Sequence, residues 1–365
     1  MSETESIGYT YDADGNRLTS REVKVGGSLV VTTYTYGKED QLLKAVITGG
    51  ATTTYTYDKD GNLKTSVTGS ATTTYAYDIE NRLTSVTTSS STTSYAYSAD
   101  SRRLKRVSGG TTTYFGNDPM TPSRMDDTIE EYTSTGTKTT TYLHGIGVDE
   151  LLGYKTNVWY SYHGDAIGSV TRLTDSGGGT PSTYRYDAFG AMRSQTGLGN
   201  TYGFASRERE SAGLYFSRAR YYDSGYGRFL TRDPAGMVDG TNLYSYAGNN
   251  PVNRIDPSGM AYLRFWVDCW WWFCVAKYRL TLNEPETQSF IGMYWMFSAG
   301  LGATALALAL LGVTAPAAAI PAFMGFAAAF TAGYIQWVDG LGGLRGVWIE
   351  TWLIPPNNPH FIWHN

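Results

Sequence analysis

Cysteine is scarce in this sequence, and its scarcity excludes a disulfide framework. The two cysteines, Cys269 and Cys274, also lack the second pair of ligands that a structural zinc site needs. We interpret them as apolar core residues or as a single bridge. Basic charge is scarce too, because 33 acidic residues outnumber 29 basic ones and leave a net charge of -4 at pH 7. Nucleic acid is therefore not an expected partner of the whole chain.

Sequence signals of export and of enzymatic activity are also missing. Residues 1–10 contain no basic segment followed by an apolar one, so no secretory signal peptide is predicted there. Residues 261–365 contain no His-Glu-x-x-His motif and no Gly-x-Ser-x-Gly elbow. Their four basic and five acidic residues give a net charge of -1, unlike a nuclease that must meet phosphate. We expect no cofactor, no metal and no catalysis by this segment.

The aromatic residues divide the chain in two. Residues 1–260 hold 25 of the 29 tyrosines but one tryptophan, Trp159, whereas residues 261–365 hold nine of the ten tryptophans. The change falls directly after Asp256-Pro-Ser-Gly259. This shift in composition predicts a domain boundary near residue 260.

The tyrosine-rich part is a repeat. Tyr-x-Tyr pairs recur at steps of 25, 21, 20 and 20 residues, beginning at Tyr9, Tyr34, Tyr55, Tyr75 and Tyr95. Each unit reads as an alternating Thr/Tyr strand, a turn and a second short strand, as in residues 52–69. A hairpin this short cannot bury a core alone, so neighbouring units must stack. The array is therefore predicted to be all-β.

The Asp-x-Asp-Gly turns of the array lack the rest of a calcium loop, and turn chemistry explains them.

These units resemble the YD repeats, also called Rhs repeats, over roughly Tyr9 to Tyr186. Residues 159–178 are similar to the segment that closes such arrays, and residues 213–259 resemble the core-associated module of the family nearly throughout. The resemblance implies a β shell whose end is plugged by that module and which carries a variable C-terminal cargo, often a toxin. It also implies N-terminal shell and delivery domains as missing partners, because far fewer repeats are present than a complete shell needs.

Two Asp-Pro pairs mark the module, Asp233-Pro234 and Asp256-Pro257. From the residues alone, Asp-Pro most simply initiates a turn. Two carboxylates brought together can instead share one proton and act as acid and base on a nearby peptide bond. The family resemblance favours this second reading: it implies an aspartyl-type self-cleavage site of Asp233, Asp256 and Arg232. The bond cut would then join Met260 to Ala261.

The last 105 residues contain a long uncharged run. The 52 residues between Glu286 and Asp339 carry no formal charge, and Pro316 and Pro321 divide them in two. Residues of about 291–338 are therefore predicted to form a hydrophobic helical hairpin. A small-residue stripe and tryptophans near the ends favour insertion into a membrane. The alternative is a hairpin buried inside a soluble domain.

The sequence thus predicts a mainly β chain followed by a small α-helical, membrane-inserting region. The expected domains are partial YD repeats (1–186), the core-associated module (187–260) and the cargo (261–365). We interpret the chain as the C-terminal part of a polymorphic toxin, delivered to a target cell by a route not visible here. Its cargo would permeabilise the target-cell membrane, and a cognate immunity protein would protect the producer. The alternatives are a structural or cell-surface repeat protein with a hydrophobic anchor, or a cargo with an unrecognised intracellular activity.

Overall fold

The computed structural model describes residues 4–118, 127–237, 240–260, 263–270, 273–282 and 347–353. The chain divides into two compact units, Met1–Tyr262 and Leu263–Asn365. Each unit is described by itself below.

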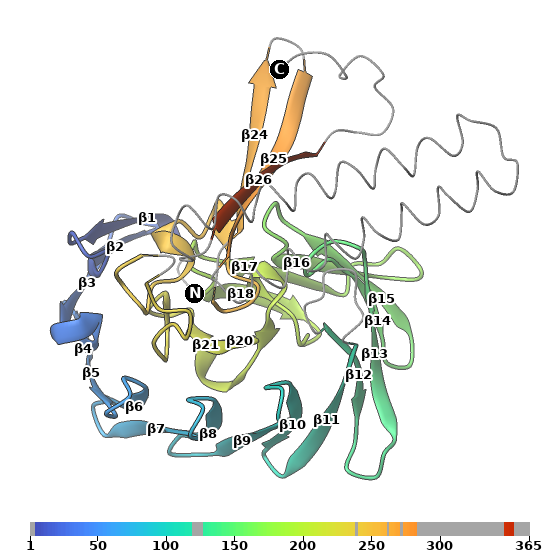
Figure 1. Ribbon diagram of the computed structural model, residues 1–365, viewed down its shortest axis with the longest axis horizontal. Coiled ribbons are helices and arrows are strands. Elements are labelled where there is room, and N and C mark those ends of the chain that lie inside the picture. Colours follow the sequence, from blue (N-terminus) through green and yellow to red (C-terminus); the bar gives the residue numbers. More distant parts are fainter. Residues whose placement is uncertain are drawn as a thin grey trace, which may run out of the picture. The chain divides into compact units, whose positions relative to one another are not determined.

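The first unit is dominated by an 18-stranded antiparallel meander, β1 to β18, in which every strand pairs with the next along the chain. The strands follow one another around an arc (Figure 1). Their bounds are Thr4–Tyr11 (β1), Arg17–Lys24 (β2), Leu29–Tyr36 (β3), Leu42–Ile47 (β4), Thr52–Tyr57 (β5), Leu63–Thr68 (β6), Ala71–Tyr77 (β7), Leu83–Thr87 (β8), Thr92–Tyr97 (β9), Arg103–Ser108 (β10), Thr111–Asp118 (β11), Asp127–Tyr132 (β12), Lys138–His144 (β13), Leu151–Lys155 (β14), Trp159–Gly164 (β15), Val170–Asp175 (β16), Ser182–Tyr186 (β17) and Met192–Gly197 (β18).

The Tyr-x-Tyr pairs explain why these short hairpins stack. Residues i and i+2 of a strand share one face, so both rings of a pair point the same way. In four of the five pairs the first tyrosine is buried in the core: Tyr34, Tyr55, Tyr75 and Tyr95. The hydroxyl of the second reaches back to the preceding repeat: Tyr77 donates to the carbonyl of Leu63 at 2.9 Å, and Tyr97 to that of Leu83 at 2.7 Å. The pairs that begin at Tyr75 and Tyr95 therefore supply both apolar burial and a hydrogen bond between repeats.

The aspartates of the turns are occupied by their own backbone. The Asp58 carboxylate accepts the N–H groups of Asp60 at 3.0 Å and Asn62 at 2.8 Å. The side chain of Asn62 in turn donates to Asn81 of the next turn at 2.7 Å. The turn chemistry predicted for these residues is confirmed by these contacts, which join successive turns along one rim of the sheet.

Of residues 187–260, predicted as the core-associated module, β18 is the last strand of the meander, and the residues from Phe204 onward lie inside the arc. There the strands Leu214–Ser217 (β20) and Arg220–Asp223 (β21) face the inner side of the meander (Figure 1). Its Leu214, Tyr221 and Leu230 join the tyrosine cluster of the repeats. Four three-residue 3₁₀ turns occur among the described residues, three of them in the module. The elements of the module are Phe204–Ser206 (η2), Glu208–Arg209 (β19), Ser211–Gly213 (η3), Leu214–Ser217 (β20), Arg220–Asp223 (β21), Arg228–Phe229 (β22), Ala247–Asn249 (η5) and Arg254–Ile255 (β23), and the fourth turn is Lys38–Asp40 (η1).

The second unit is β-structure wherever the structure describes it, so the prediction of a small α-helical, membrane-inserting C-terminal region is wrong. Strands Leu263–Trp270 (β24) and Phe273–Leu282 (β25) pair antiparallel, with Cys269 opposite Cys274, and Val347–Leu353 (β26) pairs with β25. These stretches are rich in aromatic and β-branched residues, which favour strands. The predicted hairpin at about 291–338 lies outside the described residues. Among those described, no helix has the length and apolar character to cross a membrane.

Candidate functional site

The segment Asp256–Met260 is held in one conformation by short-range contacts. The buried Asp256 carboxylate accepts the N–H of Gly259 at 2.8 Å, and the Ser258 hydroxyl accepts the N–H of Met260 at 3.1 Å. The Ser258 carbonyl accepts the N–H of Ala219 at 3.1 Å. Gly259 has a φ of 75°, and a Cβ there would lie 2.2 Å from the Ser217 carbonyl oxygen. Only glycine fits this position without displacing the segment.

Asp233 begins a turn of its own, as Asp-Pro predicts. Its carboxylate accepts the N–H of Ala235 at 2.8 Å, and its carbonyl accepts the N–H of Gly236 at 3.0 Å. The N–H of Asp233 donates to the Leu243 carbonyl at 2.9 Å. These bonds fix the direction of the Asp233 side chain.

Arg220, at the start of β21, brings the two aspartates together. Its Nη2 lies 2.8 Å from Oδ2 of Asp233 and 3.3 Å from Oδ2 of Asp256. Its Nε donates to the Gly259 carbonyl, and its Nη1 donates to the Leu243 carbonyl at 3.1 Å. The guanidinium lies over the Phe229 ring, 3.6 Å from the centroid. One buried arginine therefore binds both carboxylates and the backbone next to the predicted cleavage position.

The electrostatics of this cluster act against ionisation of its carboxyl groups. Burial raises the pKa of Asp233, although the neighbouring Arg220 opposes the shift. Both carboxylates contact the same nitrogen of Arg220, so they lie close enough for each to disfavour ionisation of the other. A cavity of about 10 Å³ touches Arg220, Asp233 and Asp256. This volume is about what one water molecule needs.

Of the residues predicted for this site, Asp233 and Asp256 meet, whereas Arg232 lies elsewhere. Arg232 forms an ion pair with Glu39 and is partly exposed. Met260 is described, and Ala261 lies outside the described residues. Sequence reasoning missed Arg220, although one signal was available: it stands beside Tyr221 and Tyr222 in a buried strand. An arginine buried there requires acidic partners.

Chemically, the arrangement combines an acid–base pair with a fixed peptide segment. A carboxyl and a carboxylate within reach of one water can take and return a proton, which is what peptide hydrolysis requires. Arg220 holds the Gly259 carbonyl, one residue before the carbonyl of Met260. The described residues contain no cluster of three or more His, Cys, Asp or Glu side chains that could hold a metal ion.

Comparison with known proteins places the described repeats in a family. The family model described as Teneurin YD-shell matches residues 2–252. The tRNA3(Ser)-specific nuclease WapA of Bacillus spizizenii is 33% identical over 263 residues, which cover 69% of this chain and 11% of that protein. Toxin subunit YenC1 of Yersinia entomophaga is 39% identical over 108 residues, which cover 28% of this chain and 11% of the subunit.

Among solved structures, the crystal structure of TcdB2-TccC3-Cdc42 aligns with a TM-score of 0.42 and 20% identity, over 70% of this chain and 17% of that one. The chain spans only about a tenth of the length of the two relatives named above.

Proposed function

The chain belongs to the Teneurin YD-shell family, and we propose that it is part of a polymorphic toxin that cuts its own backbone between Met260 and Ala261. The observation that carries this proposal is Arg220 between Asp233 and Asp256, with its Nε on the Gly259 carbonyl. The cut would separate residues 261–365, the cargo, from the repeats and the module.

In the proposed reaction the two carboxyl groups hold one proton. In the assignment proposed here, Asp233 carries the proton at the start and Asp256 is the carboxylate. The oxygen of a water molecule attacks the Met260 carbonyl carbon while Asp256 takes a proton from that water. Asp233 gives its proton to the departing nitrogen of Ala261. The C–N bond breaks, and a new carboxyl and a new amine form. Arg220 stabilises the negative charge of the pair and holds the peptide in place.

The test is the mass and N-terminal sequence of the purified chain. We expect a fragment that begins at Ala261 from the wild type. Asp233→Asn and Asp256→Asn should leave the chain whole, because an amide can neither take nor return the proton. An intact wild-type chain, or efficient cleavage in both variants, would refute the proposal.

A pair of arginine variants separates the arginine predicted from sequence from the one observed beside the aspartates. Arg220→Met should prevent cleavage, because it removes the group that binds both carboxylates. Arg232→Met should lose the contacts of Arg232 with Glu39 and with the Tyr244 hydroxyl, and should leave the pairing of the two aspartates with Arg220 in place. If Arg232→Met blocks cleavage and Arg220→Met does not, Arg232 is the assisting residue.

The role as a toxin is supported by two of the relatives, a tRNA nuclease and a toxin subunit. Both fit the proposal of a shell that carries a toxic cargo, delivered to a target cell and countered in the producer by an immunity protein. The family model ends at residue 252, so it says nothing of how residues 261–365 act. Toxicity of residues 261–365 in cells that express them would support a cargo; harmless expression would favour the structural or surface protein.

A further inference from the structure

The peptide segment next to the aspartates has a second anchor, which the proposed reaction does not use. Arg218 Nη1 donates to the Pro257 carbonyl at 2.5 Å, and Arg207 Nη1 donates to the same oxygen at 3.3 Å. Pro257 is the residue after Asp256 and lies three residues before Met260. Both arginines belong to the module, so this contact alone would hold the segment to its own domain.

The two arginines are themselves held by carboxylates of the repeats. Arg218 Nη2 lies 2.7 Å from Oδ1 of Asp149 and 2.8 Å from Oδ1 of Asp127. Arg207 forms an ion pair with the same oxygen of Asp149. Asp127 opens β12, and Asp149 lies in the loop between β13 and β14. A chain of charged contacts thus runs from two hairpins of the repeats to the Pro257 carbonyl.

Asp149 is the centre of this chain of contacts. Its side chain is 2% exposed, and its backbone adopts a φ of 56°. Burial by itself would raise the pKa of Asp149, but Arg207 and Arg218 hold that pKa below its ordinary value. The carboxylate therefore stays charged at neutral pH and keeps both guanidinium groups aligned.

We infer that Asp149 is a positioning residue for cleavage: through Arg207 and Arg218 it fixes the Pro257 carbonyl, and so makes cutting depend on docking of strands β12 to β14 onto the module. The inference rests on the proposed self-cleavage. It assigns to the repeats a part in the reaction, because a module without these strands would lack one of the two anchors of the segment. Cleavage would then follow completion of this part of the shell.

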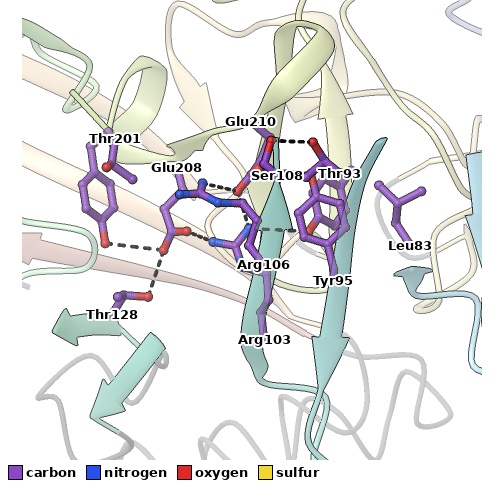
Figure 2. A network of polar contacts seen from close by, with 12 residues as sticks. Leu83, Thr93, Tyr95, Arg103, Arg106, Ser108, Thr128, Thr201, Glu208 and Glu210 are labelled. Carbon is purple, nitrogen blue, oxygen red and sulfur yellow. Dashed lines mark hydrogen bonds and ion pairs between the residues drawn. The ribbon is translucent and has the colours of Figure 1, made fainter. Parts of the chain in front are cut away.

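A second buried network provides a matched control. Glu210 is 1% exposed and, like Asp149, pairs with two arginines: its Oε1 lies 2.5 Å from Nη1 of Arg103 and 3.2 Å from Nη1 of Arg106. Figure 2 shows these residues together with Tyr95, whose hydroxyl donates to Glu210 at 3.1 Å. This network also joins the repeats to the module, and the contacts described above for Glu210 involve no residue of 256–260.

The experiment compares Asp149→Asn with Glu210→Gln in the full chain. Each variant removes one buried charge and keeps the shape of the side chain. Asp149→Asn should slow formation of the Ala261 fragment on the order of 100-fold, the loss expected when a reacting group moves by about 1 Å. Glu210→Gln should cleave at close to the wild-type rate although its melting temperature also falls. Arg218→Lys, which keeps a charge but cannot bind Asp127, Asp149 and Pro257 together, should be slow as well.

Hydrogen exchange gives a measurement that does not depend on cleavage. In an Asp233→Asn background, Asp149→Asn should increase exchange at the amides of residues 258–260, and Glu210→Gln should not. The role of Asp149 would be overturned if Asp149→Asn and Glu210→Gln, with equal melting temperatures, cleaved at equal rates. Equal exchange of the two variants at the amides of residues 258–260 would overturn it as well. If the wild type does not cleave, self-cleavage itself fails, while the exchange result still decides whether Asp149 positions the segment.

Discussion

Replacing Gly259 by alanine should slow cleavage between Met260 and Ala261 on the order of 100-fold and should also lower the stability of the fold. Gly259 lies between Asp256, which binds its N–H, and Arg220, which binds its carbonyl. The substitution adds one methyl group at the position where the segment passes closest to β20 and β21.

The magnitude follows from two separate effects. The φ of 75° costs an alanine roughly 1 to 2 kcal/mol, whatever surrounds it. The added Cβ would also lie 2.2 Å from the Ser217 carbonyl oxygen and 3.0 Å from the backbone nitrogen of Arg220. Relief of that overlap requires a backbone shift of about 1 Å, and such a displacement of a reacting group costs about 100-fold in rate.

Gly213→Ala separates the two effects. Gly213 has nearly the same φ, 76°, but a Cβ there meets nothing within 4 Å. Gly213→Ala should therefore show the loss of stability that comes from the positive φ alone, without the loss from steric overlap, and no loss of cleavage. The assay is the fraction of chain converted to the Ala261 fragment over time, read by mass spectrometry, alongside thermal unfolding of each variant. Equal cleavage rates in the two variants would show that the geometry at Gly259 does not control the reaction.

Two further predictions concern stability. Burial raises the pKa of Asp223 to about 6, so the folded chain binds this proton more tightly than the unfolded chain, and the stabilisation present below about pH 4 is lost as pH rises through about 6. Asp223→Asn should therefore reduce the change in unfolding free energy between pH 4 and pH 7 by about 2 kcal/mol, measured by denaturant titration of both proteins. The same change with pH in wild type and variant would contradict this. Tyr77→Phe leaves the Leu63 carbonyl without its 2.9 Å hydrogen bond and should cost roughly 1 to 3 kcal/mol, whereas Tyr114→Phe, at an exposed ring, should cost almost nothing by the same chemical denaturation. Equal losses would mean that the hydroxyl does not join the repeats.

The β-repeat architecture was predictable because its signals are local. A Tyr-x-Tyr pair places two rings on one face, and an aspartate such as Asp58 binds the backbone of the turn that follows the strand. The residues that form a hairpin are therefore close together in the sequence. The C-terminal region shows the limit of such reasoning. The prediction of helices rested on the long apolar run at about 291–338, and it neglected the aromatic and β-branched stretches on either side of that run. Two of them, Leu263–Trp270 and Phe273–Leu282, form strands by pairing with each other.

The two aspartates stand out in the sequence as Asp-Pro motifs, but it was the family resemblance, and not the motif, that predicted them to act together. The boundary near residue 260 was predicted from the change in composition there. The arginine beside the aspartates could not be predicted, because Arg220 lies 13 residues before Asp233 in the chain and reaches it only when β21 packs against the loops that carry the aspartates. Arg232 is adjacent in sequence, but its side chain turns to Glu39 in the repeats. In the same way, Asp149 meets Arg207 and Arg218 only through folding. Sequence determines which charges exist; the tertiary structure decides which of them are buried together, because burial forces each buried charge to find its partner.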